Sequence, residues 1–436
     1  MKGYIFLLTA LATVGLQTSC YPVRAYKTGT PVVKLRENEN ITLGYIEFDD
    51  NGELFDRNEL DQTIHQVYTL HQNSPDTGIN VFVFIHGWKN NASDEANNVA
   101  GFQDFLKTIY AHYSDEYKGT AKQGKMAPLM GIYIGWRGAS LRVAKDLTYW
   151  NRSPAAQRAG SIHMDEAIHR IILATRQPQP KGTKLVTSEA PRSNLVIIGH
   201  SFGGRVLEHV MTPYILDQIL QSDHDADHKC HSGTPMPVDS LLLPTLTILL
   251  NEAAPATDAK QFLEFLQCHD IEYGTCSKGK DCPKEDQRPL FLSVTSDGDA
   301  ANEIGTPIGQ TLARLQMKTR AYEKPDPPAI TNQSTYFTHT AAFIPALRSH
   351  EFTLKPCDSP PSPGSIRIRT DPCYDFSPIA KAWNGTPYWI ALMPNKIVPN
   401  HTDIFQAQFV NFVESFLPPS ELSQPKMRSR PTLSIR

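Results

Sequence analysis

The sequence has no large excess of charge of either sign. Its 42 Lys and Arg residues stand against 45 Asp and Glu residues, which gives a formal net charge of −3. A nucleic-acid-binding protein usually carries a basic patch that neutralises phosphates, so this balance argues against that class. The chain also lacks both glycine-rich patterns that cradle phosphates, G-x-x-x-x-G-K-[ST] and G-x-G-x-x-G. We therefore expect no nucleic-acid partner and no cofactor.

The apolar run near the N-terminus is too short to span a bilayer. Ile5–Leu16 follows Lys2 and has the length of a signal-peptide core. Small residues then precede a cysteine in Gln17-Thr18-Ser19-Cys20, which resembles the bacterial lipobox, although Gln17 stands where an aliphatic residue is usual. We expect export to the bacterial envelope. Residues 1–20 are then a signal peptide, either of the ordinary cleaved type or of the lipoprotein type with a membrane-tethering, acylated Cys20.

Cysteine is scarce, and its placement fits an exported chain. Six of the 7 cysteines lie after Cys20, namely Cys230, Cys268, Cys276, Cys282, Cys357 and Cys373. An even number can form three disulfides, for which six cysteines allow 15 connectivities. Cys357 and Cys373 bracket a Pro- and Ser-rich loop that a bridge would staple. A zinc site at 268–282 is the alternative, but the paired C-x-x-C units typical of such sites are missing, and we expect no metal.

The glycosylation sequons favour a bacterial envelope over a eukaryotic secretory route. Asn-x-Ser/Thr occurs at Asn40, Asn91, Asn151, Asn332, Asn384 and Asn400. Glycans on Asn91 or Asn400 would crowd the two segments that are assigned to the functional site below.

Strand and helix patterns alternate from about residue 40 to residue 416. Runs of β-branched and aromatic residues predict strands at 42–48, 79–85, 130–136, 194–198, 246–250 and 290–294. Amphipathic spacing predicts helices at 58–72, 93–113, 155–175, 205–220 and 403–416. This alternation predicts an α/β protein with a mostly parallel central sheet and helices on both faces. We expect one domain over 40–416 and a disordered tail over 417–436, and residues 311–388 are too loop-rich to assign.

The segment Gly199-His200-Ser201-Phe202-Gly203-Gly204 fits the pattern G-x-S-x-G. A buried strand is expected before it and an amphipathic helix after it, which is the context that a nucleophile elbow needs. The glycines remove Cβ atoms that would clash where the strand and the helix pack closely at the turn. We predict that Ser201 is a nucleophile. The alternative is a serine in an ordinary glycine-rich turn.

With this elbow the chain resembles the α/β-hydrolase superfamily. More narrowly, it is similar to uncharacterised bacterial serine hydrolases with a strand-end His-Gly-Trp followed by Asn-Asn-Ala, here within 86–92. The resemblance covers 79–416. It implies an oxyanion hole made by the backbone N–H groups of Trp88 and Phe202. We expect His86 itself to orient this loop without transferring protons.

A serine nucleophile needs an acid and a base, which follow it along the chain in this superfamily. Asp299 lies in the loop after the strand that begins near 290, and it resembles the family's Asp because small residues and the segment Gly305-Thr306-Pro307-Ile308-Gly309 follow it. Asp297 is the competitor, two residues away. Glu252 and Asp258 are more remote options.

His401 stands just before the last expected helix, where the resemblance places the base. Thr402 or Asp403 would then be a natural N-cap for that helix. His339 and His350 are alternatives for the base. Arg137, at the end of the strand 130–136, can bind a negative group of the substrate or form a surface ion pair.

These residues predict a hydrolase that cleaves carboxylic esters through an acyl-enzyme, with Ser201, Asp299 and His401 as its triad and a small ester or acyl compound as its substrate. Alternatives on the same scaffold are an acyltransferase, a thioesterase or an amidase, since the fold does not determine the leaving group. A non-catalytic binding protein of the envelope is another alternative, but a binding module does not need a complete Ser–Asp–His set. Residues 141–158 are a candidate lid.

Overall fold

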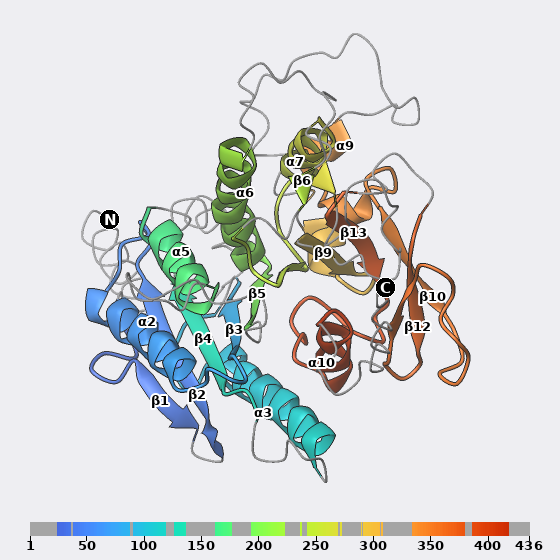
Figure 1. Cartoon of the computed structure of the whole chain (residues 1–436). Helices are drawn as coiled ribbons and strands as arrows, with labels where there is room; N and C mark the ends of the chain where they lie inside the picture. The colour runs from blue at the N-terminus through green and yellow to red at the C-terminus, as the bar shows by residue number, and fades with distance from the viewer. Residues whose placement is uncertain are drawn as a thin grey trace, which may run out of the picture.

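In the computed structural model of this chain, the described residues are 24–35, 38–87, 90–118, 126–136, 162–176, 193–222, 236–237, 242–268, 271–272, 289, 291–305, 307, 334–379 and 386–417. They form an α/β structure around one large sheet (Figure 1). Several expected features lie outside these residues: the signal peptide with Cys20, the amide of Trp88, Arg137, the candidate lid and residues 418–436 of the tail. Leu417, expected to begin the disordered tail, is described and packs into the core instead.

Within the described residues, eight strands form the central sheet. In spatial order they are β1 (Val32–Leu35), β2 (Asn38–Phe48), β4 (Leu129–Trp136), β3 (Asn80–Ile85), β5 (Asn194–His200), β7 (Leu246–Leu250), β9 (Phe291–Ser296) and β13 (Tyr388–Met393). Only the pairing of β1 with β2 is antiparallel among these strands, and the other pairs are parallel. The expectation of a mostly parallel sheet is therefore confirmed.

Successive side chains of a strand point to opposite faces of the sheet, and each face has its own hydrophobic core. In β3, Val81, Val83 and Ile85 pack on one face of the sheet, whereas Phe82 and Phe84 pack on the other, and all five are fully buried. A strand covered on both faces is mostly apolar along its whole length, and this explains why β3, β4 and β7 consist almost entirely of apolar residues.

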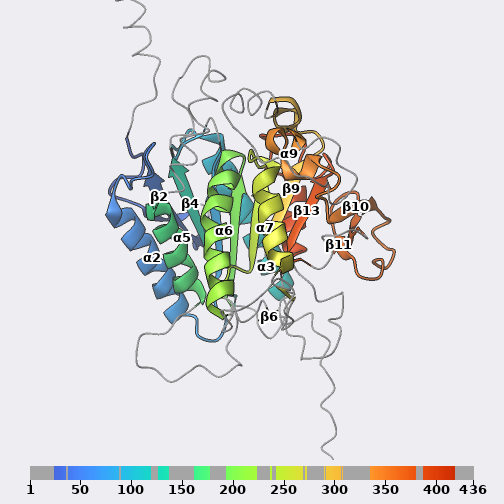
Figure 2. The ribbon, with the colours of Figure 1, turned by 90° about the horizontal axis from the view of Figure 1, so that it is seen from above.

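Helices cover both faces of the sheet (Figure 2). The helices on the first face are α2 (Arg57–Gln72), α5 (Ile162–Arg176), α6 (Phe202–Ser222) and α7 (Ala256–Cys268). On the opposite face, α3 (Asn97–Tyr117) packs beside the short C-terminal helix α10 (Ala407–Glu414). Helices on both faces were expected from the alternation of strands and helices. No helix in the described part of the chain is long and apolar enough to cross a membrane.

The region assigned to loops contains regular structure next to β13. A three-stranded antiparallel sheet is formed by β10 (His350–Leu354), β12 (Tyr374–Pro378) and β11 (Ile366–Ile368), in that order. Cys357 and Cys373 form a disulfide across this unit, as their positions around the Pro- and Ser-rich loop predicted. The remaining short elements are α9 (Ser334–Thr338), the π-helix η4 (Ala301–Gly305), the 3-10 helix η5 (Ala341–Phe343) and the two-residue strands β6 (Met236–Pro237) and β8 (Ile271–Glu272).

The final helix begins later than the sequence pattern predicted. Its N-cap is Gln406, not Thr402 or Asp403, and no side chain caps it. The Asn400 side chain explains the difference, because its Oδ1 accepts hydrogen bonds from the backbone N–H groups of Thr402, at 2.9 Å, and Asp403, at 3.0 Å. A local Asx turn of this kind competes with helix formation.

Candidate active site

The candidate site lies at the carboxyl edge of the parallel sheet. The chain winds from β3 outward to β4, then crosses back to β5 and continues in the opposite direction through β7, β9 and β13. The reversal falls between β3 and β5, and open α/β sheets bind ligands outside the strand ends at such a point. Gly87 follows β3 and Ser201 follows β5 at this position.

Ser201 occupies a tight turn between β5 and α6. Its φ angle is 57°, in the left-handed region that a residue with a side chain rarely adopts. The end of β7 holds this turn from both sides, since the Ser201 N–H donates to the Leu250 carbonyl at 3.0 Å and the Ser201 carbonyl accepts from the Ala253 N–H at 3.2 Å. The residue is therefore held in a strained conformation by its neighbours, as a nucleophile elbow requires.

Glycine is required around the elbow because neighbouring backbones approach too closely for a side chain. A Cβ atom on Gly203 would lie 2.3 Å from the carbonyl oxygen of Ile85, and one on Gly87 would lie 2.6 Å from the Cβ of Ser201. Both distances are well below van der Waals contact. The glycines of the G-x-S-x-G pattern and of the His-Gly-Trp loop thus permit the strand ends of β3 and β5 to meet.

His401 lies between Ser201 and Asp299. Its Nε2 is 2.8 Å from the Ser201 Oγ, and its Nδ1 is 2.8 Å from Asp299 Oδ2 and 2.9 Å from Oδ1. These contacts suit a neutral imidazole whose Nδ1–H donates to the carboxylate and whose Nε2 accepts from the hydroxyl. Asp299 and Ser201 are buried, whereas the His401 side chain is 18% exposed, so the site is open to solvent on the histidine side. All three residues predicted from the sequence are brought together.

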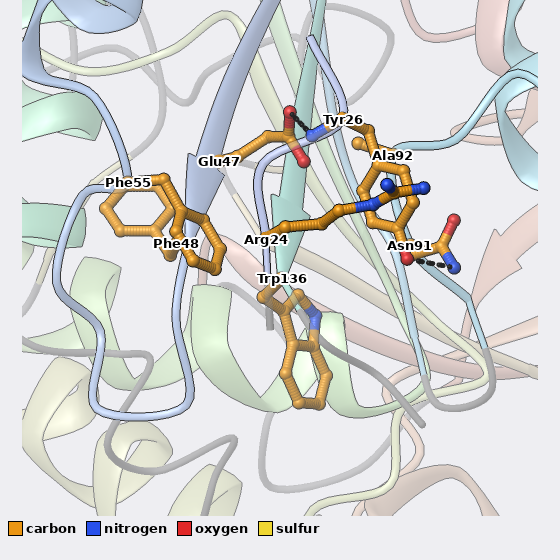
Figure 3. A pocket seen from close by; sticks show the side chains of 8 residues that line it. All are labelled: Arg24, Tyr26, Glu47, Phe48, Phe55, Asn91, Ala92 and Trp136. Carbon is orange, nitrogen blue, oxygen red and sulfur yellow. Dashed lines mark hydrogen bonds between the residues drawn. The ribbon is translucent and has the colours of Figure 1, made fainter. Parts of the chain in front are cut away.

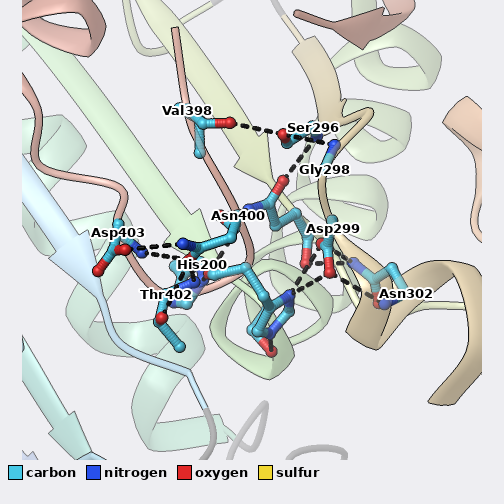
Figure 4. A network of polar contacts seen from close by, with 12 residues as sticks. His200, Ser296, Gly298, Asp299, Asn302, Val398, Asn400, Thr402 and Asp403 are labelled. Atoms are coloured by element: carbon cyan, nitrogen blue, oxygen red, sulfur yellow. Dashed lines mark hydrogen bonds and ion pairs between the residues drawn. The ribbon is translucent and has the colours of Figure 1, made fainter. Parts of the chain in front are cut away.

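Asp299 is held in place by a residue that was not predicted. Asn302 donates to both of its carboxylate oxygens, from the backbone N–H at 3.0 Å and from Nδ2 at 2.9 Å (Figure 4). Asp297, the competing acid, is exposed and accepts a hydrogen bond from the backbone N–H of Asn395 instead. The geometry thus favours Asp299 as the partner of His401.

The other acids and histidines considered from the sequence lie elsewhere. Glu252 is buried next to Glu208, and Asp258 is exposed at the start of α7. His339 contacts the neighbouring Thr338 hydroxyl. His350 stacks on Trp389 with ring centroids 3.9 Å apart, and burial lowers its pKa to about 3. None of these four contacts Ser201 or His401 in the described part of the chain.

His86 is a structural residue, as expected. Its Nδ1–H donates to the Gly87 carbonyl at 2.8 Å, and its Nε2 accepts from the backbone N–H of Trp136 at 2.9 Å. The Trp136 indole stacks parallel to the imidazole and donates from Nε1 to the His86 carbonyl. Burial lowers the pKa of His86 to about 4, so the ring is neutral at physiological pH and fixes the path of the loop after β3.

Of the two expected oxyanion donors, Phe202 is among the described residues and Trp88 is not. Phe202 is the first residue of α6, directly after Ser201, and its side chain is buried. Its backbone N–H belongs to the N-terminal end of the helix, where the macrodipole favours negative charge. Trp88 lies outside the described residues, but Gly87 precedes it in contact distance of Ser201.

The first described residues of the chain are fastened beside this site. The backbone N–H groups of Tyr26 and Lys27 donate to Oε1 of Glu47 at 2.8 and 2.7 Å. Tyr26, together with Arg24, lines a small hollow that Trp136 closes from below (Figure 3). Glu47 and Trp136 are near the carboxyl ends of β2 and β4, so this segment lies at the same edge of the sheet as Ser201.

Three further polar residues, which the sequence patterns did not predict, connect the loops of the site. They are His200, Asn251 and Asn302, and each bonds to a residue from a different loop. A buried amide after a strand carries no motif, so a strand-end position was the only signal that could have drawn attention to Asn251. Within the described ranges, no three His, Cys, Asp or Glu side chains gather as a metal site would need.

Comparison of the chain with known protein families, with curated proteins and with solved structures gives no significant match. The geometry of this site and its sequence motifs are therefore the only indications of what the chain does.

Proposed function

We propose that this protein is a serine hydrolase of the α/β-hydrolase type that cleaves carboxylic esters through an acyl-enzyme. One observation carries the proposal: the His401 imidazole lies within 2.8 Å of both the Ser201 hydroxyl and the Asp299 carboxylate. The strained turn at Ser201 and its place at the winding reversal of the sheet support it further.

In the first half of the reaction, the Ser201 Oγ attacks the ester carbonyl carbon while His401 Nε2 takes the hydroxyl proton. Asp299 holds the Nδ1–H of His401 and stabilises the imidazolium that forms. When the tetrahedral intermediate collapses, the C–O bond to the alcohol breaks and His401 returns the proton to the leaving oxygen. The acyl group is then esterified to Ser201.

In the second half, water attacks the acyl-enzyme and His401 takes its proton. Collapse of the second intermediate frees the carboxylic acid and returns the proton to Ser201. We assign the backbone N–H groups of Phe202 and Trp88 to the oxyanion of both intermediates. Loss of one such donor typically raises the barrier by about 3 kcal/mol.

We further propose that the protein is exported to the bacterial envelope and that Cys20 tethers it to a membrane. The disulfide between Cys357 and Cys373 supports export, because such bonds persist in oxidising compartments. The N-terminal apolar run followed by Thr18-Ser19-Cys20 supports the tether.

A panel of p-nitrophenyl esters of increasing acyl length, tested on the wild type and on Ser201→Ala, tests the proposal. We expect hydrolysis by the wild type and a rate near the uncatalysed one for the variant. Ser193→Ala is a matched control, because Ser193 is also buried but lies at the amino end of β5, where it accepts from the Ile79 N–H. Hydrolysis that survives in Ser201→Ala would refute the assignment.

A further inference from the structure

Asn251 contacts both of the loops that carry the other members of the proposed triad. Its Oδ1 accepts from the backbone N–H of Ser296 at 2.8 Å, at the start of the Asp299 loop. Its Nδ2 donates to the carbonyl of Asn400 at 3.1 Å, next to His401. One amide side chain thus bridges the end of β9 and the loop after β13.

The backbone carbonyl of Asn251 is also connected to Asp299, through the side chain of Asn302. Its carbonyl accepts from Asn302 Nδ2 at 2.7 Å. The same Nδ2 donates to Asp299 at 2.9 Å (Figure 4). The flanking residues hold the nucleophile, because Leu250 and Ala253 make the two backbone hydrogen bonds to Ser201. The segment 250–253 therefore contacts, directly or through one residue, all three catalytic positions.

The conformation of Asn251 is as unusual as its contacts. The residue is fully buried and has a φ angle of 47°. Asn adopts this left-handed region more readily than most residues, and strained backbone is retained where surrounding contacts over-determine it. Its neighbour in space, Ser201, is the other non-glycine residue with positive φ among the described residues.

The chemistry of the position selects an amide. On one side the group must accept from an N–H, and on the other it must donate to a carbonyl. Asp can accept but cannot donate when ionised, and the hydroxyl of Ser is too short to span two loops. Because the position is buried, a donor or acceptor left without a partner there would be costly. The two loops therefore require an amide side chain at residue 251.

We propose that Asn251 is a positioning residue that holds the loops of Ser201, Asp299 and His401 at their catalytic distances. The inference depends on the proposed function, since it concerns the same triad. Asn251 touches no reacting atom. It acts through the segments that carry Ser201, Asp299 and His401, and misplacement of a catalytic group by about 1 Å can lower a rate about 100-fold.

Two variants separate the side chain from the backbone. Asn251→Asp keeps a similar shape and the acceptor for Ser296, but it loses the donor to Asn400. Asn251→Gly keeps the left-handed backbone without strain and loses both side-chain contacts. A loss of activity in both variants assigns the effect to the amide rather than to the backbone angle.

The test measures the rate at which a fluorophosphonate probe labels Ser201, together with kcat and KM for a p-nitrophenyl ester, on folded protein with its melting temperature recorded. We expect labelling and kcat to fall about 10- to 100-fold in both variants while KM stays within about twofold, because Asn251 is fully buried and cannot contact the substrate. A merely structural role would lower the melting temperature and leave kcat per labelled site unchanged, and this result would overturn the inference.

Asn194→Asp is the matched control. It also loses an amide donor, the one from Asn194 Nδ2 to Asn80 Oδ1 at 2.9 Å, but at the amino edge of the sheet. We expect it to label at the wild-type rate. Equal labelling of wild type, Asn251→Asp and Asn251→Gly would refute the role of Asn251 alone. Absence of labelling in the wild type, or labelling that persists in Ser201→Ala, would instead refute the proposed function and the inference with it.

Discussion

The Nε2 atom of His200 lies 2.7 Å from the carbonyl oxygen of His401. A carbonyl can only accept, so Nε2 carries the proton and donates it. Nδ1 of His200 is buried and has no hydrogen-bond partner among the described residues. Burial lowers the pKa of His200 to about 3, and the ring is therefore neutral throughout the physiological range. The residue before Ser201 thus holds the loop that carries His401.

Replacing His200 with Phe would remove this hydrogen bond while keeping a ring of similar size. We expect kcat for ester hydrolysis to fall about 10-fold, since the His401 loop loses a donor worth about 1 kcal/mol and becomes less well positioned. Steady-state kinetics on purified protein would measure the change. An unchanged kcat would show that the contact does not help to place His401.

The choice between the two neighbouring acids can be tested with a pair of isosteric variants. Asp299→Asn removes the carboxylate that contacts His401 Nδ1 and should lower kcat by about 10⁴-fold, as loss of a triad acid does elsewhere. Asp297→Asn alters an exposed side chain that accepts from the Asn395 N–H, and it should leave kcat within about threefold of wild type. The reverse ranking would contradict the assignment of Asp299.

Two buried carboxyl groups beneath the elbow predict a pH-dependent stability. Glu208 on α6 forms a hydrogen bond with Glu252 and accepts another from the Tyr388 hydroxyl at 3.1 Å. Burial raises the pKa of Glu208 to about 8 and that of Glu252 well above its usual range. Because the folded state binds protons that the unfolded state has released above about pH 4.5, this contribution is complete below that pH and is lost as pH rises through 8.

We therefore expect these two groups to make the free energy of unfolding decrease as pH rises from about 6.5 to 8, by up to about 1.4 kcal/mol per pH unit for each proton involved. Below about pH 6.5 the buried His86, His200 and His350 act in the opposite sense, because they stay neutral where the unfolded chain binds protons. Glu208→Gln should flatten this dependence, because the amide donates at every pH. Urea denaturation at three pH values would measure the slopes. Glu264→Gln, at an exposed residue of α7 that pairs with Lys260, is the control and should keep the wild-type slope. Equal slopes for all three proteins would contradict the prediction.

The disulfide between Cys357 and Cys373 closes a loop with a sequence separation of 16 residues. A loop of this length stabilises a fold by about 3 kcal/mol in the chain-entropy account. We expect the double variant Cys357→Ser/Cys373→Ser to lose a free energy of unfolding of this order, measured by urea denaturation without reductant. Ester hydrolysis by the folded variant should keep its kcat, since neither cysteine contacts the triad.

Six of the eight strands of the central sheet could be predicted because their signals are local, whereas β1 and β13 were not predicted. The predicted strands are rich in buried apolar residues, as in the run Phe82 to Ile85, and Ser201 stands in a motif with a specific context. His401 and Asp299 were found through chain order and resemblance, and the structure places their side chains at hydrogen-bonding distance. These elements have nearly the expected boundaries, because strand and helix periodicities are strong in fully buried segments.

The small second sheet, the start of the last helix and the role of Asn251 could not be predicted, because they depend on contacts that form only in the folded chain. The strand β11 has three residues, and β10 is exposed at alternate positions without a long apolar pattern, so neither stands out from a loop. The Asx turn of Asn400 delays the last helix, and a capping pattern at Thr402 and Asp403 looks the same whether or not that turn forms. Likewise, the role of Asn251 arises from loops about 45 and 150 residues away in sequence.

The hydrogen bonds from the backbone of Tyr26 and Lys27 to Glu47 fix the position of the chain just after Cys20. Three residues separate Cys20 from Arg24, and an extended chain advances at most about 3.6 Å per residue, so a lipid on Cys20 would be within about 14 Å of Arg24. Arg24 lines a hollow at the carboxyl edge of the sheet, where the buried Ser201 lies beside the partly exposed His401. If Cys20 carries a lipid, as proposed, the bilayer that holds it would lie near the carboxyl edge of the sheet, and a tethered enzyme would present its proposed site on the membrane side.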